Sequence, residues 1–364
     1  MEDFFSFTLS NLEAQIGALG KEKYRARQLF RWVYNQGNLD FHEMTNIPKG
    51  LRTVFSEMFS LDLLPVRDEC PSHDGSTRFA FTAGDGEVIE SVVMPEKNRV
   101  TLCVSTQIGC RMGCRFCVTG KIGFRRNLTT GEIVRQVITV REYLKKLQKD
   151  PVTNIVFMGM GEPMDNSENV MAALDILKDQ SGLDYSYRKI TLSSVGLVDG
   201  LKMLDAKAAV IAISLNAADD DTRSLLMPIN RLYSIGKIMD FVRNFKGTKR
   251  TRITFEYILI KGINDSLEDA RRLADLLKDV KCKINLIPYN ASSYTEFERP
   301  DRADIDRFHE YLINRYFTVI IRDSRGQDVS AACGQLGMSY LEEAPSPHTP
   351  SSGKKRPSAP KVIS

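Results

Sequence analysis

The chain has 364 residues, of which 42% are hydrophobic and 26% are charged, the composition of an ordinary soluble, folded protein. No run of about 18 apolar residues occurs, so the sequence predicts no membrane-spanning helix. The first residues lack the basic and apolar regions of a signal peptide, so we expect a cytoplasmic protein whose seven cysteines stay reduced.

The net charge of +4 comes from the end of the chain. Residues 344–364 contain four basic side chains and no acidic one, so subtracting them from 50 basic residues leaves 46 against 46 acidic ones. The same segment is rich in Pro, Ser and Thr, and we therefore predict a disordered basic tail over 343–364. A role with nucleic acid would need a local basic patch, because the body of the chain is neutral.

Residues 1–60 have helical character. Between Tyr24 and Tyr34, apolar side chains recur at helical spacing and arginines occupy the remaining surface. Such an aromatic stripe is more typical of a core than of a base-stacking platform, whereas the arginines could contact phosphate. We predict a small helical accessory domain over 1–72.

Strand patterns follow from residue 75. Segments 77–82 and 88–94 flank the turn Gly84-Asp85-Gly86, which predicts a β-hairpin extension over 73–100. A further strand over 101–106 leads directly into a loop that is rich in cysteine.

That loop carries Cys110, Cys114 and Cys117 in the spacing C-x3-C-x2-C. Three close thiolates can hold three irons of a four-iron cluster, which leaves the fourth iron open to a ligand. A zinc site usually pairs C-x2-C with a second Cys or His pair, and no histidine lies near this loop. We therefore favour an iron–sulfur cluster over zinc or a disulfide loop.

Strands and helices alternate from residue 129 onward. Thr129 and Glu132 form a predicted capping box at the start of a helix that ends near residue 149. Predicted strands lie at 154–158, 189–193, 209–214, 252–259, 283–288 and 318–322. This pattern predicts an α/β fold, a partial (β/α)6 barrel over 101–342 that resembles a TIM barrel.

Polar residues follow several of these strands. In βα barrels the site lies at the C-terminal ends of the strands, so we expect these residues to converge on one mouth. They are Cys110, Glu162, Ser193, Asn216 and Asn290.

The cysteine loop resembles the signature of the radical S-adenosylmethionine (SAM) enzymes. The resemblance implies a [4Fe–4S] cluster on these cysteines, with SAM bound through its amino and carboxylate groups to the open iron. Segment 159–163, Gly-Met-Gly-Glu-Pro, resembles the second motif of these enzymes. The resemblance implies that the backbone at Gly161 approaches SAM closely and that Glu162 accepts a hydrogen bond from the ammonium group of SAM. Further SAM contacts are expected at Ser193, Ser214, Leu215, Asn216 and Asn290.

More of the chain resembles one family of radical SAM methyltransferases, which methylates C2 of adenine in 23S rRNA and in certain tRNAs. Matching segments are 24–34, 43–46, 101–110, 157–163, 284–290 and 331–336. This implies that Cys333 accepts a methyl group from one SAM while a second SAM supplies the radical. It also implies that Glu90 removes the C2 proton and that a Cys103–Cys333 disulfide frees the product.

The same resemblance implies 23S rRNA and tRNA as substrates, RNA contacts in the accessory domain and an electron donor such as flavodoxin. We expect a monomer. Basic residues near the cysteine loop could steer the RNA backbone or form an ordinary solvated face, and we weigh the two equally. They are Arg111, Arg115, Lys121, Arg125 and Arg126.

Two alternatives remain. The first is a C8-specific antibiotic-resistance rRNA methyltransferase with the same cysteine set, against which Pro163 speaks because that enzyme typically has Ala there. The second is a non-catalytic iron–sulfur or zinc protein whose cysteines are structural.

Overall fold

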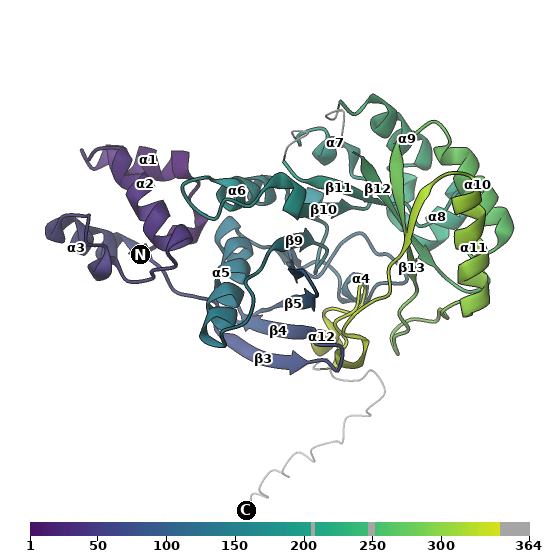
Figure 1. Cartoon of the computed structure of the whole chain (residues 1–364), viewed down its shortest axis with the longest axis horizontal. Coiled ribbons are helices and arrows are strands. Elements are labelled where there is room, and N and C mark those ends of the chain that lie inside the picture. Colours follow the sequence, from purple (N-terminus) through teal and green to yellow (C-terminus); the bar gives the residue numbers. More distant parts are fainter. Residues whose placement is uncertain (205–207, 247–251, 343–364) are drawn as a thin grey trace, which may run out of the picture.

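The computed structural model describes residues 1–204, 208–246 and 252–342. The predicted basic tail over 343–364 lies outside the described residues. Figure 1 shows the N-terminal helices beside a larger body in which helices surround a curved sheet. No helix of the described residues is long and apolar enough to cross a membrane.

One sheet of ten strands runs in the order β14-β13-β12-β11-β10-β9-β6-β5-β4-β3. Neighbours from β6 to β14 pair in parallel. These strands are β6 (Arg99–Cys103), β9 (Asn154–Phe157), β10 (Ile190–Ser194), β11 (Val210–Ser214), β12 (Ile253–Leu259), β13 (Cys282–Pro288) and β14 (Thr318–Ile321). In the described part of the chain, the two edge strands β14 and β3 do not pair with each other. The barrel is therefore open, as predicted.

Three antiparallel strands extend the sheet beyond β6. They are β5 (Val88–Glu96), β4 (Thr77–Thr82) and β3 (Val66–Pro71). The sequence pattern missed β3, whose residues are mostly exposed and include three charged side chains. The predicted hairpin is therefore continuous with the main sheet, and the domain boundaries at 72 and 100 stay predictions.

Helices cover the outside of the parallel strands (Figure 1). Both bonds of the capping box that begins α5 are present, at 3.1 Å from the Glu132 amide to Thr129 Oγ1 and 2.9 Å from the Thr129 amide to Glu132 Oε2. The helices are α5 (Thr130–Lys146), α6 (Ser167–Lys178), α7 (Val198–Leu201), α8 (Asp220–Leu226), α9 (Ile235–Asn244), α10 (Leu267–Leu277) and α11 (Arg302–Asn314). The alternation predicted from sequence is confirmed.

The N-terminal part contains α1 (Leu9–Ala18), α2 (Tyr24–Phe30) and α3 (Lys49–Met58), with β1 (Glu2–Asp3) paired to β2 (Phe59–Ser60). The stripe continues from α2 into the one-turn helix after it, and its members Leu29, Phe30, Val33 and Tyr34 are buried. These side chains therefore form core and do not present a surface for stacking on bases. An ion pair of 2.6 Å between Asp3 and Arg135 ties this part to α5.

Smaller elements complete the fold. β7 (Gln107–Ile108) pairs with β8 (Arg126–Asn127), and α4 (Val118–Ile122) contacts α12 (Met338–Glu342). One-turn helices lie at Phe4–Ser6, Arg31–Asn35, Phe41–Glu43, Pro163–Asn166, Tyr187–Lys189, Pro228–Arg231 and Gln327–Val329.

After β14 the chain crosses back over the sheet. Its residues Ala331 and Leu336 pack against Val92 of β5, Cys103 of β6 and Val156 of β9. This small core is separate from the main hydrophobic core. It fixes the segment around Cys333 against the face of the sheet that carries Cys103.

Candidate active site

The cysteine loop lies between β7 and α4. Cys114 is buried, while Cys110 and Cys117 are half-buried. All three are free thiols, and each interacts electrostatically with the other two. The loop therefore gathers the three cysteines into one group, as the spacing predicted.

Burial raises the pKa of Cys110 to about 12 and holds that of Cys114 well above its ordinary value, so metal binding must displace protons. Among the described residues, no three His, Cys, Asp or Glu side chains converge closely enough to hold a single metal ion. A four-iron cluster offers a separate iron to each thiolate, so its ligands need not meet at one atom. Three unoxidised cysteines gathered in one loop fit such a cluster.

Glu162 lies beside this loop, directly after the Gly-Met-Gly turn. Its carboxylate accepts from the amides of Met164 (3.0 Å) and Val195 (2.9 Å), and burial raises its pKa to about 7. Gly161 has a φ of 95°, and a Cβ there would lie 2.5 Å from the Gln107 side chain. The glycine is thus required by close packing against β7, and a contact of Gly161 with SAM stays a prediction.

The ends of β10 and β11 meet around a carboxylate that sequence analysis missed. Glu256, in the middle of β12, accepts from Ser193 Oγ at 2.7 Å and from Ser214 Oγ at 3.4 Å. Its other oxygen is buried without a hydrogen bond and lies 3.9 Å from the Arg322 guanidinium. A buried acceptor left open is a position where a ligand donor fits.

Leu215 and Asn216 follow β11, and both amides donate to the Glu256 carbonyl. The Asn216 side chain accepts from the Ile258 amide at 3.0 Å and contacts Met227 Sδ at 3.2 Å. This side chain therefore braces the strand ends. Any contact of these two residues with SAM stays a prediction.

Asn290, after β13, connects the strand ends to the Cys333 segment. Its side-chain amide donates to the Cys333 carbonyl at 3.0 Å and to Ser324 Oγ at 2.8 Å. Its carbonyl oxygen is buried without a hydrogen-bond partner. Together with Glu256, Asn290 thus presents the open polar atoms that a polar cofactor such as SAM requires.

Cys103 and Cys333 interact electrostatically across the small core. Burial raises the pKa of Cys103 to about 12, and desolvation also raises the pKa of Cys333 although that residue is exposed. Arg322 opposes the shift at both thiols. The expected Cys103–Cys333 disulfide is absent: all seven cysteines, which the described ranges include, are free.

Glu90 of β5 is completely buried and forms an ion pair of 2.7 Å with Arg78 of β4. Its second oxygen accepts from the Gly337 amide at 2.6 Å. A side chain that resembled an outward-facing strand residue is therefore bonded to the segment that carries Cys333. Its role as a proton acceptor stays a prediction.

Four of the five basic residues near the cysteine loop are paired with carboxylates. Arg126 contacts Asp85 at 2.6 Å and Glu132 at 2.8 Å. The other pairs are Arg111–Asp165, Arg115–Glu296 and Arg125–Glu87. This pairing favours a structural role for these arginines over the steering of phosphate.

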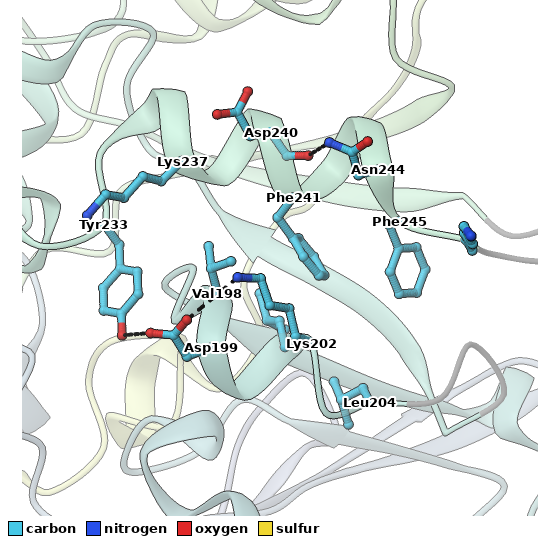
Figure 2. A pocket seen from close by; sticks show the side chains of 12 residues that line it. Val198, Asp199, Lys202, Leu204, Tyr233, Lys237, Asp240, Phe241, Asn244 and Phe245 are labelled. Carbon is cyan, nitrogen blue, oxygen red and sulfur yellow. Dashed lines mark hydrogen bonds and ion pairs between the residues drawn. The ribbon is translucent and has the colours of Figure 1, made fainter.

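Figure 2 shows a pocket of about 690 Å³ between α7 and α9. Asp199 there bonds to Tyr233 at 2.9 Å and pairs with Lys202 at 3.7 Å. The pocket shares no residue with the strand-end site, and its lining does not indicate a ligand.

Comparisons with known proteins agree with this geometry. Residues 104–277 match the family model described as the radical SAM superfamily, and residues 2–61 match the ribosomal RNA large subunit methyltransferase N-terminal domain. The crystal structure of a radical SAM methyltransferase from Sphaerobacter thermophilus is similar, with a TM-score of 0.86, 41% sequence identity and coverage of 92% of this chain and 99% of that chain. Fold and site thus define a radical SAM methyltransferase.

Curated relatives narrow this class. The dual-specificity RNA methyltransferase RlmN of Geobacter sulfurreducens is 47% identical over 338 residues, which cover 92% of each chain. That of Geotalea uraniireducens is 45% identical over 335 residues, 92% of this chain and 96% of the relative. The chain belongs to the RlmN family, whose cofactors are a [4Fe–4S] cluster and SAM. This confirms the predicted enzyme over the non-catalytic alternative.

Proposed function

We propose that the chain methylates C2 of adenine in 23S rRNA and in tRNA, and that Cys333 carries the methyl group from SAM to the base. One observation supports this most: Cys103 and Cys333 are free thiols that interact electrostatically, and residues on both sides of Cys333 pack against Cys103 or bond to Glu90. An enzyme that only cleaves SAM needs neither two cysteines outside the cluster loop nor this carboxylate.

The chemistry of the base explains the need. C2 of adenine is electron-poor, so it does not attack the electrophilic methyl group of SAM. When bound, the cluster and SAM supply the one-electron chemistry that activates the carried methyl group. Cys333 accepts the methyl group on its sulfur, and Glu90 takes the C2 proton once the methyl carbon is bonded to C2. The Cys103 thiolate then attacks the Cys333 sulfur, so the S–S bond forms as the bond between that sulfur and the transferred carbon breaks, and the carbon takes up a proton to become the product methyl group. A thiol reductant returns the disulfide to two thiols. The disulfide is therefore transient, which is compatible with free thiols in the resting chain.

The remaining side chains orient and bind. Glu162 receives the SAM ammonium group, while Ser193, Ser214 and Asn290 line the cofactor pocket with their polar atoms. Leu215 and Asn216 complete the pocket behind β11. The target adenine must leave its stack to enter, and the N-terminal domain contacts the surrounding RNA. We further propose a cytoplasmic monomer that takes electrons from a donor such as flavodoxin.

Nucleoside mass spectrometry of rRNA and tRNA tests the reaction. Cells that lack the protein should lose 2-methyladenosine, and wild-type protein should restore it whereas Cys333→Ala should not. Loss of 8-methyladenosine with 2-methyladenosine intact would instead identify the C8-specific relative and overturn the proposal.

Cys103→Ala tests the resolving role. Because the variant cannot attack the Cys333 sulfur, we expect a covalent protein–RNA adduct to accumulate, visible as a nuclease-sensitive shift on a denaturing gel. Cys282→Ala, which removes a buried cysteine at the start of β13, is the matched control and should give no adduct. Free methylated RNA at the wild-type yield from Cys103→Ala would refute the resolving role.

A further inference from the structure

Among the described residues, Arg223 of α8 is one of the largest side chains that are completely buried. Its guanidinium donates to the carbonyls of Val195 (2.6 Å), Leu215 (3.0 Å) and Tyr233 (3.0 Å) and to Asn230 Oδ1 (2.7 Å). Val195 follows β10 and Leu215 follows β11. One side chain therefore holds together the ends of two strands that border the cofactor pocket.

The acceptors of Arg223 are all neutral. Within residues 1–204, 208–246 and 252–342, no carboxylate lies within ion-pair distance of this guanidinium, although buried charges are normally paired. Burial lowers its pKa only to about 10, so the side chain stays charged at neutral pH. Asp220 acts on the guanidinium only from beyond ion-pair distance, so the interior holds a positive charge without a directly paired carboxylate.

The cysteine loop lies beside the C-terminal end of α8. The Arg115 amide donates to the Leu226 carbonyl at 2.9 Å, which joins the loop to the end of α8. Cys114, the buried cysteine of the loop, interacts electrostatically with Arg223. A cluster held by three thiolates would add negative charge near a guanidinium that has no directly paired carboxylate.

We propose that Arg223 is a positioning residue that clamps the ends of β10 and β11 for SAM and supplies the internal positive charge facing the cluster. This rests on the cofactors in the proposed function but not on the RNA base that is methylated. A positive charge stabilises the reduced, more negative cluster, so Arg223 raises its reduction potential. The clamp fixes backbone on which the SAM contacts depend.

Redox-poised electron paramagnetic resonance of the reconstituted protein tests the charge. Arg223→Gln should shift the reduction potential of the cluster to a lower value, whereas Arg223→Lys, which keeps the charge, should stay close to the wild type. Arg231→Gln is the matched control, because Arg231 is exposed in the one-turn helix that follows α8. Equal potentials in Arg223→Gln and the wild type, or equal shifts in Arg223→Gln and Arg231→Gln, would overturn the charge role.

Equilibrium binding of SAM to the cluster-loaded protein tests the clamp. Lysine cannot reach all the acceptors that the guanidinium bonds, so both Arg223 variants should bind SAM at least about tenfold more weakly. Asn230→Ala removes one acceptor without changing the charge, and it should weaken SAM binding at an unchanged potential. Reduced thermal stability with wild-type SAM affinity would show a purely structural arginine and overturn the clamp. Neither readout uses RNA, so a failure of the C2 assignment would leave this result intact.

Discussion

Arg78 and Glu90 show how a residue in the site depends on a partner outside it. The carboxylate is completely buried, while the arginine keeps 15% of its side chain exposed and reaches Asp68 at 3.8 Å. A charged group that reaches the surface thus provides the buried Glu90 carboxylate with its ion-pair partner. A proton acceptor has to be ionised before it can act.

Replacing only one residue of the Arg78–Glu90 ion pair should lower the free energy of unfolding more than replacing both. Arg78→Met leaves a buried carboxylate uncompensated, and we expect a loss of roughly 3–5 kcal/mol in the free energy of unfolding. Glu90→Gln in the same chain should recover much of this loss, as urea denaturation of the metal-free protein would show. Additive losses in the double variant would mean that the two side chains do not interact.

The raised pKa of Glu162 predicts a pH dependence of stability. Desolvation lifts its pKa from the ordinary 4.5 to about 7, so the folded protein binds this proton more tightly than the unfolded chain. The resulting stabilisation is complete below pH 4.5 and is lost as the pH rises towards 7. Chemical denaturation of the metal-free protein should show a weaker decline for Glu162→Gln than for the wild type.

Glu168→Gln provides the control for that experiment, because Glu168 is exposed in the first turn of α6. It should follow the wild-type curve. The same decline in Glu162→Gln as in the wild type would contradict the assignment of the titration to Glu162.

At the scale of the elements, the segment after β14 depends on bonds to other parts of the chain. Gly337 has a φ of 92°, and a Cβ there would lie 2.3 Å from Ile122 of α4. Its amide bonds to Glu90, and the Leu336 carbonyl accepts from Thr119 Oγ1 at 2.8 Å. No helical or strand pattern specifies such a segment, which explains why only the resemblance identified it.

Gly337→Ala should loosen this segment, because alanine is strained at this φ by about 1–3 kcal/mol and also meets Ile122. Cys103 lies beneath the segment with 7% of its surface exposed, so its alkylation by a maleimide should accelerate in the metal-free variant. Gly50→Ala, on α3 with nothing within 4 Å, should leave the rate unchanged. An unchanged rate in folded Gly337→Ala would rule out a covering role.

At the scale of the whole molecule, the parallel strands were predictable and the charged interior was not. Apolar runs such as 252–259 located β12 within one residue. From the order of strands and helices we also predicted that Cys110, Ser193 and Asn290 lie at one mouth, which stays a prediction. Glu256 offered a signal that was overlooked, a carboxylate inside an apolar strand. Arg223 offered none, since the residues Asp219 to Thr222 before it resemble a solvated helix start. Its role depends on carbonyls that only the tertiary fold assembles.

The ion pairs of the arginines near the cysteine loop allow a prediction of how RNA affinity depends on salt concentration. Among the described basic residues near the cysteine loop, Lys121 is exposed and has no ion pair, unlike Arg126. If Lys121 contacts phosphate, Lys121→Ala should reduce the slope of log affinity for tRNA against log salt by about one. Arg126→Ala should lower stability and leave the slope unchanged. A reduced slope in Arg126→Ala with an unchanged slope in Lys121→Ala would instead show that the ion-paired arginines contact phosphate.

The return of the chain over the sheet after β14 also has a consequence for biosynthesis. All ten strands precede Cys333 in the sequence, so a growing chain can pair its strands before this thiol leaves the ribosome. Cys333, the methyl carrier in the proposed function, then arrives at a pocket that is already built, and not at a half-folded chain with six other thiols exposed. Because Cys333 is the last cysteine to be synthesised, the order of synthesis protects it from disulfide formation with wrong partners.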